Sequence, residues 1–311
     1  VLALKDAGWP VAVIDNLTTG FRFAVPEGVP LYEGDIEDGA LLARIFAEQQ
    51  IGAVMHFAGS IIVPESVENP LKYYHNNTAK SRALIAAAVA GGVPHFIFSS
   101  TAATYGTPET DGPITETTPQ KPINPYGWSK LMVERILADF DAAHGIRSIP
   151  LRYFNAAGAD PEGELGERHE PETHLLPLIL QAASGRRTAI TVYGRDYDTP
   201  DGTCIRDYVH VSDLVAAHAL AVDYLLAGGV STAFNLGNGQ GFSVQQVIDT
   251  ASRITGRQIG VSEAPRRAGD PPRLVADPKK ANEILGWQPQ FASLEQIVTH
   301  AWAWEQKHPW Q

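Results

Sequence analysis

The segment Tyr126-Gly127-Trp128-Ser129-Lys130 places a phenol and an ammonium group four residues apart. Asn124 and Pro125 just before it predict the start of a helix, and side chains four apart in a helix lie on one face. An ammonium next to a phenol favours the phenolate, which lowers the pKa of the tyrosine from about 10 towards neutral pH. The spacing predicts a tyrosine general base, but such pairs also arise by chance, so the surrounding residues must decide.

A hydroxyl and a carboxylate follow two apolar runs. Thr101 comes directly after Phe98-Ser99-Ser100, and Asp15 closes the run Val11-Ala12-Val13-Ile14. In α/β proteins ligands bind at the carboxyl edge of the sheet, where Thr101 could bond a substrate oxygen and Asp15 the ribose hydroxyls of a dinucleotide. Both residues also suit ordinary turns. Because a carboxylate there would repel a 2′-phosphate, we expect NAD rather than NADP as the dinucleotide.

The elements that would position these residues alternate along the first half of the chain. Branched apolar runs at 11–14, 53–57, 95–98 and 148–151 predict buried strands. Apolar residues repeat at intervals of three and four from Leu41 to Phe46 and from Leu131 to Phe140, which predicts helices between the strands. The alternation predicts an α/β fold, a doubly wound parallel sheet of the Rossmann type.

The amino-acid composition of the sequence changes after Asn155. The stretch 159–173 is rich in Gly, Pro and acidic residues, which indicates a loop at a lobe boundary. We predict an NAD-binding Rossmann domain over residues 1–155 and a smaller, mainly helical lobe over 156–311 that binds the substrate, with part of 206–232 packing back on the first domain. Helix starts in the second lobe are predicted by the pairs Ser243/Gln246 and Ser293/Gln296 and by Asp277-Pro278.

The amino end of the sequence resembles the end of a helix, from Val1 to Trp9. A Rossmann sheet usually has a strand and a Gly-rich turn before that helix, where backbone amides hold the pyrophosphate. We therefore expect further residues before Val1 in the native protein. The alternative, a fold that never had this unit, would leave the strand at 11–14 without its usual central neighbour.

Composition limits the partners. The formal net charge is -11, from 24 basic and 35 acidic residues, which disfavours nucleic acid. Cys204 is the single cysteine, so the chain forms no internal disulfide and fits a reducing compartment, the cytoplasm by default. The apolar run 214–230 contains His218 and Asp223 and is a poor candidate for a membrane span.

Seven segments give the sequence a recognisable order. They are His56-Phe57-Ala58-Gly59, Tyr73-Tyr74-His75-Asn76-Asn77, Tyr126-Gly127-Trp128-Ser129-Lys130, Arg152-Tyr153-Phe154-Asn155, Asp201-Gly202-Thr203, Arg206-Asp207-Tyr208-Val209-His210-Val211, and Ala264-Pro265-Arg266-Arg267 with Gly269-Asp270. The first, third and the Ser99-Ser100-Thr101 strand end resemble the extended short-chain dehydrogenase/reductase superfamily. Together the segments resemble its UDP-glucose 4-epimerase family, from about Leu2 to Trp310.

The resemblance implies roles for particular positions. The catalytic set would be Thr101, Tyr126 and Lys130. NAD would be held by Asp15, Asn16, Asp35, Ile36, Phe57, Ala58, Gly59, Asn76, Tyr126, Lys130, Tyr153 and Phe154. The nucleotide sugar would contact Thr101, Asn155, His174, Leu175, Thr191, Val192, Tyr193, Arg206, Arg267, Asp270 and Leu274. The arginines also suit a pyrophosphate on chemical grounds, although an isolated Arg is usually a solvated surface charge. No metal is implied.

The activity implied is that of an isomerase of galactose metabolism, a cytoplasmic homodimer that interconverts UDP-glucose and UDP-galactose through a 4-keto sugar and a transient hydride transfer to NAD. The helical regions 78–89 and 127–140 would form the dimer contact, although their apolar faces could equally be core. Three alternatives remain: an epimerase of N-acetylated UDP-hexosamines, one of UDP-uronates, and a non-catalytic NAD-sensing protein. Related 4,6-dehydratases carry an acid pair where this chain has Ala102 and Ala103, which counts against elimination.

Three positions depart from the family pattern or vary within it. The family often has Lys where this chain has Ile61, and usually Ser where it has Thr101. Leu274 aligns with the residue that borders the sugar C2 substituent. Tyr there resembles enzymes restricted to UDP-glucose and UDP-galactose, and small residues resemble those that also accept N-acetylated sugars. Leu is intermediate in size, so we expect weak activity on UDP-N-acetylglucosamine, unless Leu274 simply packs inside the protein.

Overall fold

The computed structural model describes residues 1–109, 112–267 and 270–307. Gly269 and Trp310 of the family-like segments lie outside these residues. The chain divides into two compact units, which are described one at a time. The first contains residues 1–106, 119–152 and 215–234, and the second contains residues 107–118, 153–214 and 235–311.

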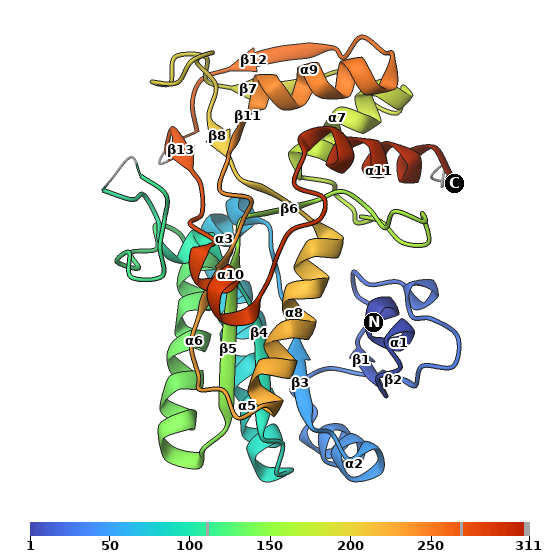
Figure 1. The fold of residues 1–311 in the computed structure, drawn as a ribbon, viewed down its shortest axis with the longest axis vertical. Helices are drawn as coiled ribbons and strands as arrows, with labels where there is room; N and C mark the ends of the chain where they lie inside the picture. The colour runs from blue at the N-terminus through green and yellow to red at the C-terminus, as the bar shows by residue number, and fades with distance from the viewer. Residues whose placement is uncertain (110–111, 268–269, 308–311) are drawn as a thin grey trace. The chain divides into compact units, whose positions relative to one another are not determined.

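The first unit is a parallel α/β structure (Figure 1). Its strands are β1 (Val13–Asp15), β2 (Leu31–Glu33), β3 (Ala53–His56), β4 (His95–Thr101), β5 (Arg147–Tyr153) and β10 (Phe234–Leu236). Its helices are α1 (Leu2–Asp6), α2 (Gly39–Gln49), α3 (Val63–Glu68), α4 (Pro70–Tyr73), α5 (Lys80–Ala90), α6 (Pro125–His144) and α8 (Val211–Leu226), with short segments η1 (Arg22–Ala24), η2 (Tyr74–Ala79) and η3 (Ala102–Thr104). The α/β fold that the alternating pattern predicts is thus confirmed.

Sheet pairing in this unit follows the predicted strands. One sheet has the order β10-β5-β4-β3, and a second pairs β1 with β2. β3 runs parallel to β4 with Met55 opposite Ile97, and β1 runs parallel to β2 with Ile14 opposite Tyr32. β4 and the two helices α5 and α6, which precede and follow it in the chain, contribute apolar side chains, and a core of Leu84, Ile85, Phe96, Phe98, Val133 and Leu137 forms between them. This core fixes the carboxyl end of β4 against α6.

The second unit combines short strands with helices (Figure 1). The strands are β6 (Asn155–Ala157), β7 (Ile190–Tyr193), β8 (Ile205–Arg206), β9 (Tyr208–His210), β11 (Phe242–Ser243), β12 (Val261–Ala264) and β13 (Arg273–Leu274). The helices are α7 (Leu175–Ser184), α9 (Val244–Thr255), α10 (Lys279–Leu285) and α11 (Leu294–Lys307). β7 pairs with β12, β6 with β9, and β8 lies between β11 and β13. α7, α9 and α11 share an apolar core.

Helix starts in the second unit follow the capping residues with one exception. Ser243 and Gln246 form the reciprocal capping box at α9, as predicted. Ser293 Oγ accepts the backbone N–H of Gln296 at 3.2 Å before α11. The prediction that Pro278 is the first residue of a helix is wrong, because Pro278 has ψ 1° and α10 begins at Lys279. Among the described residues, none of the helices is long and apolar enough to cross a membrane.

Candidate active site

The lysine of the predicted catalytic pair is fixed in the first unit. Asn124 caps α6 through a hydrogen bond from Gly127 N, which makes Tyr126 and Lys130 members of the first two turns. Lys130 is buried, its Nζ donates to the Ser99 carbonyl oxygen at 2.9 Å, and it lies 5.0 Å from the centre of the Phe98 ring. Burial lowers the pKa of Lys130 to about 8. The ammonium is therefore held in one place and titrates near neutral pH.

Thr101 is the last residue of β4, two residues beyond the Ser99 carbonyl that anchors Lys130. Its Oγ1 accepts the backbone N–H of Ala103 at 3.1 Å and so caps η3. A hydroxyl that accepts one hydrogen bond still has its own proton to donate. The turn role and the substrate role that the sequence left open are therefore compatible at Thr101.

The loop after β3 lies next to the same lysine. A Cβ added to Gly59 would meet Asn77 Oδ1 at 3.1 Å and Lys130 Nζ at 3.5 Å, so the backbone here approaches both groups closely. Asn77 is buried and bonds both backbone groups of Ser60, accepting from N at 2.7 Å and donating to O at 2.9 Å. Asn76 donates to the Ser60 hydroxyl at 3.0 Å. Both asparagines belong to η2, a π-helical segment of the kind often found at functional sites.

Three polar residues predicted to hold the cofactor meet beyond β1 and β2. Asp15 Oδ1 accepts from Leu17 N at 2.7 Å, and Asn16 Nδ2 donates to Asp35 at 3.0 Å. Lys80 of α5 also donates to Asp35, at 2.6 Å. Burial alone would raise the pKa of Asp35, but the hydrogen bonds from Lys80 and Asn16 outweigh it and hold the pKa low. This edge therefore carries two carboxylates that could accept from ribose hydroxyls.

Other predicted cofactor residues differ in what their side chains offer. The Ile36 side chain is buried in the core, so only its backbone remains for a ligand. Phe57 and Ala58 are exposed at the end of β3, and the Phe57 ring stacks on His218 with centroids 4.8 Å apart. Tyr153 and Phe154 are half-buried between β5 and β6.

In the second unit, the structure pairs Arg206 of β8 with Asp270 through an ion pair. Arg206 also donates to the Ile205 carbonyl at 2.8 Å. In the parallel pairing of β8 with β13, Leu274 lies directly opposite Arg206. Asn155 at the start of β6 donates its side-chain amide to the Asp207 carbonyl at 2.9 Å. Four residues predicted to contact the nucleotide sugar, from three separate parts of the sequence, thus lie near one another.

A second arginine of this unit stacks on an aromatic ring. Arg267 lies over Tyr193 of β7, with its guanidinium carbon 4.0 Å from the ring centre. Thr191 is exposed on the same strand and bonds the Ser262 hydroxyl at 3.1 Å, whereas the Val192 side chain is buried. A guanidinium on a ring face keeps its in-plane donors for an anion.

His174 and Leu175 lie at the amino end of α7. His174 contacts Glu167 and Glu172, and His169 Nε2 lies 3.2 Å from His174 Nδ1. The sequence analysis did not single out Glu167, His169 or Glu172. The signal was present, because the triplet Glu-x-His occurs twice, five residues apart, at 167–169 and 172–174.

A buried ion pair behind Thr101 was also missed. Arg152 of β5 donates to Glu134 of α6 at 2.6 and 3.0 Å, and to the Tyr105 hydroxyl at 2.9 Å. Ser100 donates to the same glutamate at 2.5 Å. The arginine and glutamate side chains are 8% and 6% exposed. Because this network joins β4, β5 and α6, it holds the strand end that carries Thr101.

Comparisons with known proteins show the family of the chain. The model of the NAD dependent epimerase/dehydratase family matches residues 1–237. The chain is 52% identical to a UDP-glucose 4-epimerase of Streptococcus mutans over 96% of this chain and 90% of that protein. Two solved structures are also similar. The UDP-glucose 4-epimerase of Brucella ovis in complex with NAD has a TM-score of 0.95, 48% identity and coverage of 97% of this chain and 92% of that one.

The second is the UDP-glucose 4-epimerase of Bifidobacterium longum in complex with NAD+ and UDP. It has a TM-score of 0.91 and 38% identity, and the match covers 99% of this chain and 94% of that one. The family model extends over most of the chain, and the likenesses extend over nearly all of it. The chain belongs to the NAD dependent epimerase/dehydratase family.

Proposed function

We propose that this chain is an NAD-dependent isomerase that interconverts UDP-glucose and UDP-galactose by reversible oxidation at C4 of the sugar. The observation that carries the proposal is the anchoring of Lys130 on the Ser99 carbonyl, beside Thr101 and one helical turn from Tyr126. The similar proteins named UDP-glucose 4-epimerase support the choice of substrate. The site residues themselves are proposals.

Tyr126, as phenolate, takes the proton of the sugar 4-hydroxyl. Lys130 stabilises that anion, because a positive charge beside a phenol favours its ionised form. The Thr101 hydroxyl donates to the same sugar oxygen. NAD, when bound, accepts the hydride from C4 and returns it. In the reverse half-reaction Tyr126 gives its proton back to the 4-oxygen, so the protein ends in its starting state.

The residues at the strand ends fit NAD. Asp15 and Asp35 offer carboxylate acceptors for ribose hydroxyls and would oppose the charge of a 2′-phosphate. Gly59 lets the backbone after β3 approach the Lys130 ammonium, because a Cβ there would crowd Asn77. A carboxylate-lined cofactor edge therefore favours NAD over NADP.

The nucleotide would be held by the guanidinium groups of Arg206 and Arg267, which suit a pyrophosphate. Asp270 now neutralises the first, and the Tyr193 ring supports the second. A firm grip on UDP combined with looser contacts to the hexose would let the 4-keto sugar turn and present its other face. The contacts to the hexose must therefore be weaker than those to the UDP group.

The rival activities differ in their products. Purified protein should convert UDP-galactose to UDP-glucose, which proton nuclear magnetic resonance distinguishes by the signals of C1 and C4 hydrogens. UDP-glucuronate and UDP-N-acetylglucosamine are tested in parallel. Faster turnover of either would reassign the substrate, a 4-keto-6-deoxy product would make it a dehydratase, and bound NAD with no turnover of any sugar would favour the sensing protein.

The homodimer that the family resemblance implies is part of this proposal, together with a cytoplasmic location that suits the single buried Cys204. The faces of η2, α5 and α6 form an open groove lined by Tyr74, Thr78, Ala79, Arg82, Met132 and Ile136. Met132 is 40% exposed within it. Light scattering should give twice the chain mass, and Met132→Asp should lower it to one chain. A monomeric wild type would contradict the dimer.

A further inference from the structure

Four side chains of metal-ligating types gather in the loop before α7. One ligand atom from each of Glu167, His169, Glu172 and His174 lies within 4.8 Å of the others. His169 Nε2 is 3.1 Å from Glu167 Oε1, 3.2 Å from His174 Nδ1 and 3.3 Å from Glu172 Oε1. Ligand atoms bound at zinc distances in a tetrahedron are about 3.3 to 3.5 Å apart. The three separations from His169 Nε2 are close to that value, whereas His174 Nδ1 contacts Glu167 directly and lies 3.8 Å from Glu172, so these two side chains would shift when an ion binds.

The His169 ring is oriented as metal-binding histidines usually are. Its Nδ1 lies 3.0 Å from the Pro171 carbonyl oxygen. Because a carbonyl can only accept, this nitrogen carries the ring hydrogen. In a neutral ring Nε2 then carries the lone pair that a metal ion would use, which is how an outer carbonyl sets the tautomer of a metal ligand.

A cation also accounts for the charges of the cluster. Two carboxylates and two imidazole nitrogens face one another, so a positive charge is needed among them. Balancing both carboxylates with protons on both rings would place two imidazolium groups with their nitrogens 3.2 Å apart, and like charges at that distance repel. One divalent cation would balance both carboxylates and use both lone pairs.

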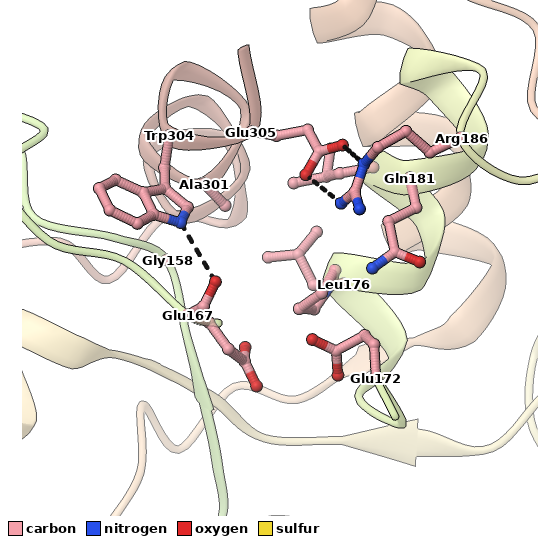
Figure 2. Close-up of a pocket in the computed structure, with 11 residues that line it drawn as sticks. Gly158, Glu167, Glu172, Leu176, Gln181, Arg186, Ala301, Trp304 and Glu305 are labelled. Carbon is pink, nitrogen blue, oxygen red and sulfur yellow. Dashed lines mark hydrogen bonds and ion pairs between the residues drawn. The ribbon is translucent and has the colours of Figure 1, made fainter. Parts of the chain in front are cut away.

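The surrounding residues hold the ligands in place. A Cβ on Gly166 would come within 2.3 Å of the Trp304 ring, so this glycine lets the loop lie against α11. Trp304 Nε1 donates to the Glu167 carbonyl at 3.1 Å, and Figure 2 shows this bond on one side of the pocket that Glu172 also lines. Glu172 is 6% exposed and accepts the backbone N–H groups of Thr173 and His174. His174 is 45% exposed and leaves a way in for an ion.

We propose that Glu167, His169, Glu172 and His174 bind one divalent cation of the zinc type. Two imidazoles and two carboxylates suit zinc, whereas magnesium and calcium prefer oxygen ligands alone. The ion would tie the loop to the first turn of α7 and so fix the backbone at His174 and Leu175. Its binding does not rest on the proposed reaction, and it is measured without any sugar.

The experiment uses the full chain after treatment with a chelator. Zinc or cobalt is added, the excess is removed by dialysis, and the metal content is measured. We expect about one zinc per chain, and with cobalt the visible absorption of a tetrahedral site. His169→Gln and Glu167→Gln should each weaken zinc binding by at least the roughly 10- to 100-fold that loss of an outer-shell partner costs.

Glu164→Gln is the matched control, because Glu164 is an exposed acid of the same loop outside the cluster, and it should bind zinc as the wild type does. Circular dichroism checks that each variant is folded, and the cobalt spectrum of the wild type needs no variant. A wild type that retains no zinc and gives no cobalt spectrum would overturn the proposal. So would a folded His169→Gln that binds zinc with unchanged affinity.

Discussion

Lys130 in the first unit and Arg206 in the second are both cationic groups of the candidate site, but they are held differently. Lys130 is buried and bonds a backbone carbonyl, which carries no net charge to offset its own. Arg206 pairs with the carboxylate of Asp270. A catalytic ammonium must keep its place throughout the reaction, whereas a binding guanidinium can exchange an acid for a phosphate. The difference is the one expected if Lys130 assists chemistry, as proposed, and Arg206 holds the substrate.

Removing the phenol next to Lys130 should have the largest effect on rate. Tyr126→Phe is expected to lower kcat by at least ~100-fold, the usual contribution of a general base, with little change in stability. Steady-state kinetics with UDP-galactose measure this. Tyr224→Phe, at a hydroxyl that accepts the backbone N–H of Val230 near the end of α8, is the control. Near-native turnover by the Tyr126→Phe variant would show that Tyr126 is not the general base.

Loss of the guanidinium should act on binding instead. Arg206→Met is expected to raise KM for UDP-galactose roughly 10- to 100-fold with a smaller change in kcat, since a hydrogen bond to a charged group contributes about 1.5 to 3 kcal/mol. Arg253→Met, which removes an exposed ion pair between Arg253 of α9 and Glu295 of α11, should leave KM unchanged. If Arg206→Met lowered kcat and left KM unaltered, the distinction between Lys130 as a catalytic cation and Arg206 as a binding cation would be contradicted.

The strand residue opposite Arg206 should set substrate breadth. We expect kcat/KM for UDP-N-acetylglucosamine to be roughly 10- to 200-fold below that for UDP-glucose, as for a misfit of one or two methylene groups. Leu274→Ser should narrow the gap, because Leu274 lies beside Arg206 in the sheet. Kinetics of both proteins on both sugars test this. If the ratio of kcat/KM for the two sugars were unchanged in Leu274→Ser, Leu274 would have no role in substrate selection.

The smallest expected effect is a dependence on pH. Activity and stability should respond in opposite directions when Lys130 loses its proton. Burial lowers the pKa of Lys130 to about 8 from an ordinary value of 10.5. The ammonium is thus present below about pH 8, and kcat/KM should fall as pH rises through that value. The unfolded chain keeps the proton up to about 10.5, so the contribution of this group to stability should rise between pH 8 and 10.5.

Lys130→Arg tests that assignment, because a guanidinium does not titrate in this range. The fall of kcat/KM above pH 8 should disappear from the pH profile of the variant, whatever its absolute rate. Denaturant unfolding at pH 7 and pH 9.5 gives the stability side. If the fall persisted in Lys130→Arg, another group would be responsible for it.

Sequence reasoning succeeded where the signal is local. Asn124 and Pro125 set the start of α6, and Ser243 with Gln246 sets the start of α9, since each cap acts within one turn. The strands with continuous apolar runs were found for the same reason. Pro278 was misplaced by one residue because a proline fits both the cap and the first turn.

Contacts between residues distant in the sequence could not be predicted from the sequence patterns. Arg206 and Asp270 are 64 residues apart in the sequence, and Arg152 of β5 pairs with Glu134 of α6. The repeated Glu-x-His triplet signals the cluster at Glu167, but its assembly also depends on how closely the loop approaches Trp304 at Gly166. The resemblance to a family supplied roles for single residues, but only the fold brings their side chains together.

The most direct test of the proposed reaction follows the hydrogen at C4. UDP-galactose carrying deuterium at C4 is incubated with the protein in ordinary water, and the product is analysed by mass spectrometry and nuclear magnetic resonance. The account predicts UDP-glucose that keeps its deuterium at C4, because the hydride leaves that carbon and returns to it. UDP-glucose with hydrogen from water at C4, or no UDP-glucose at all, would contradict it.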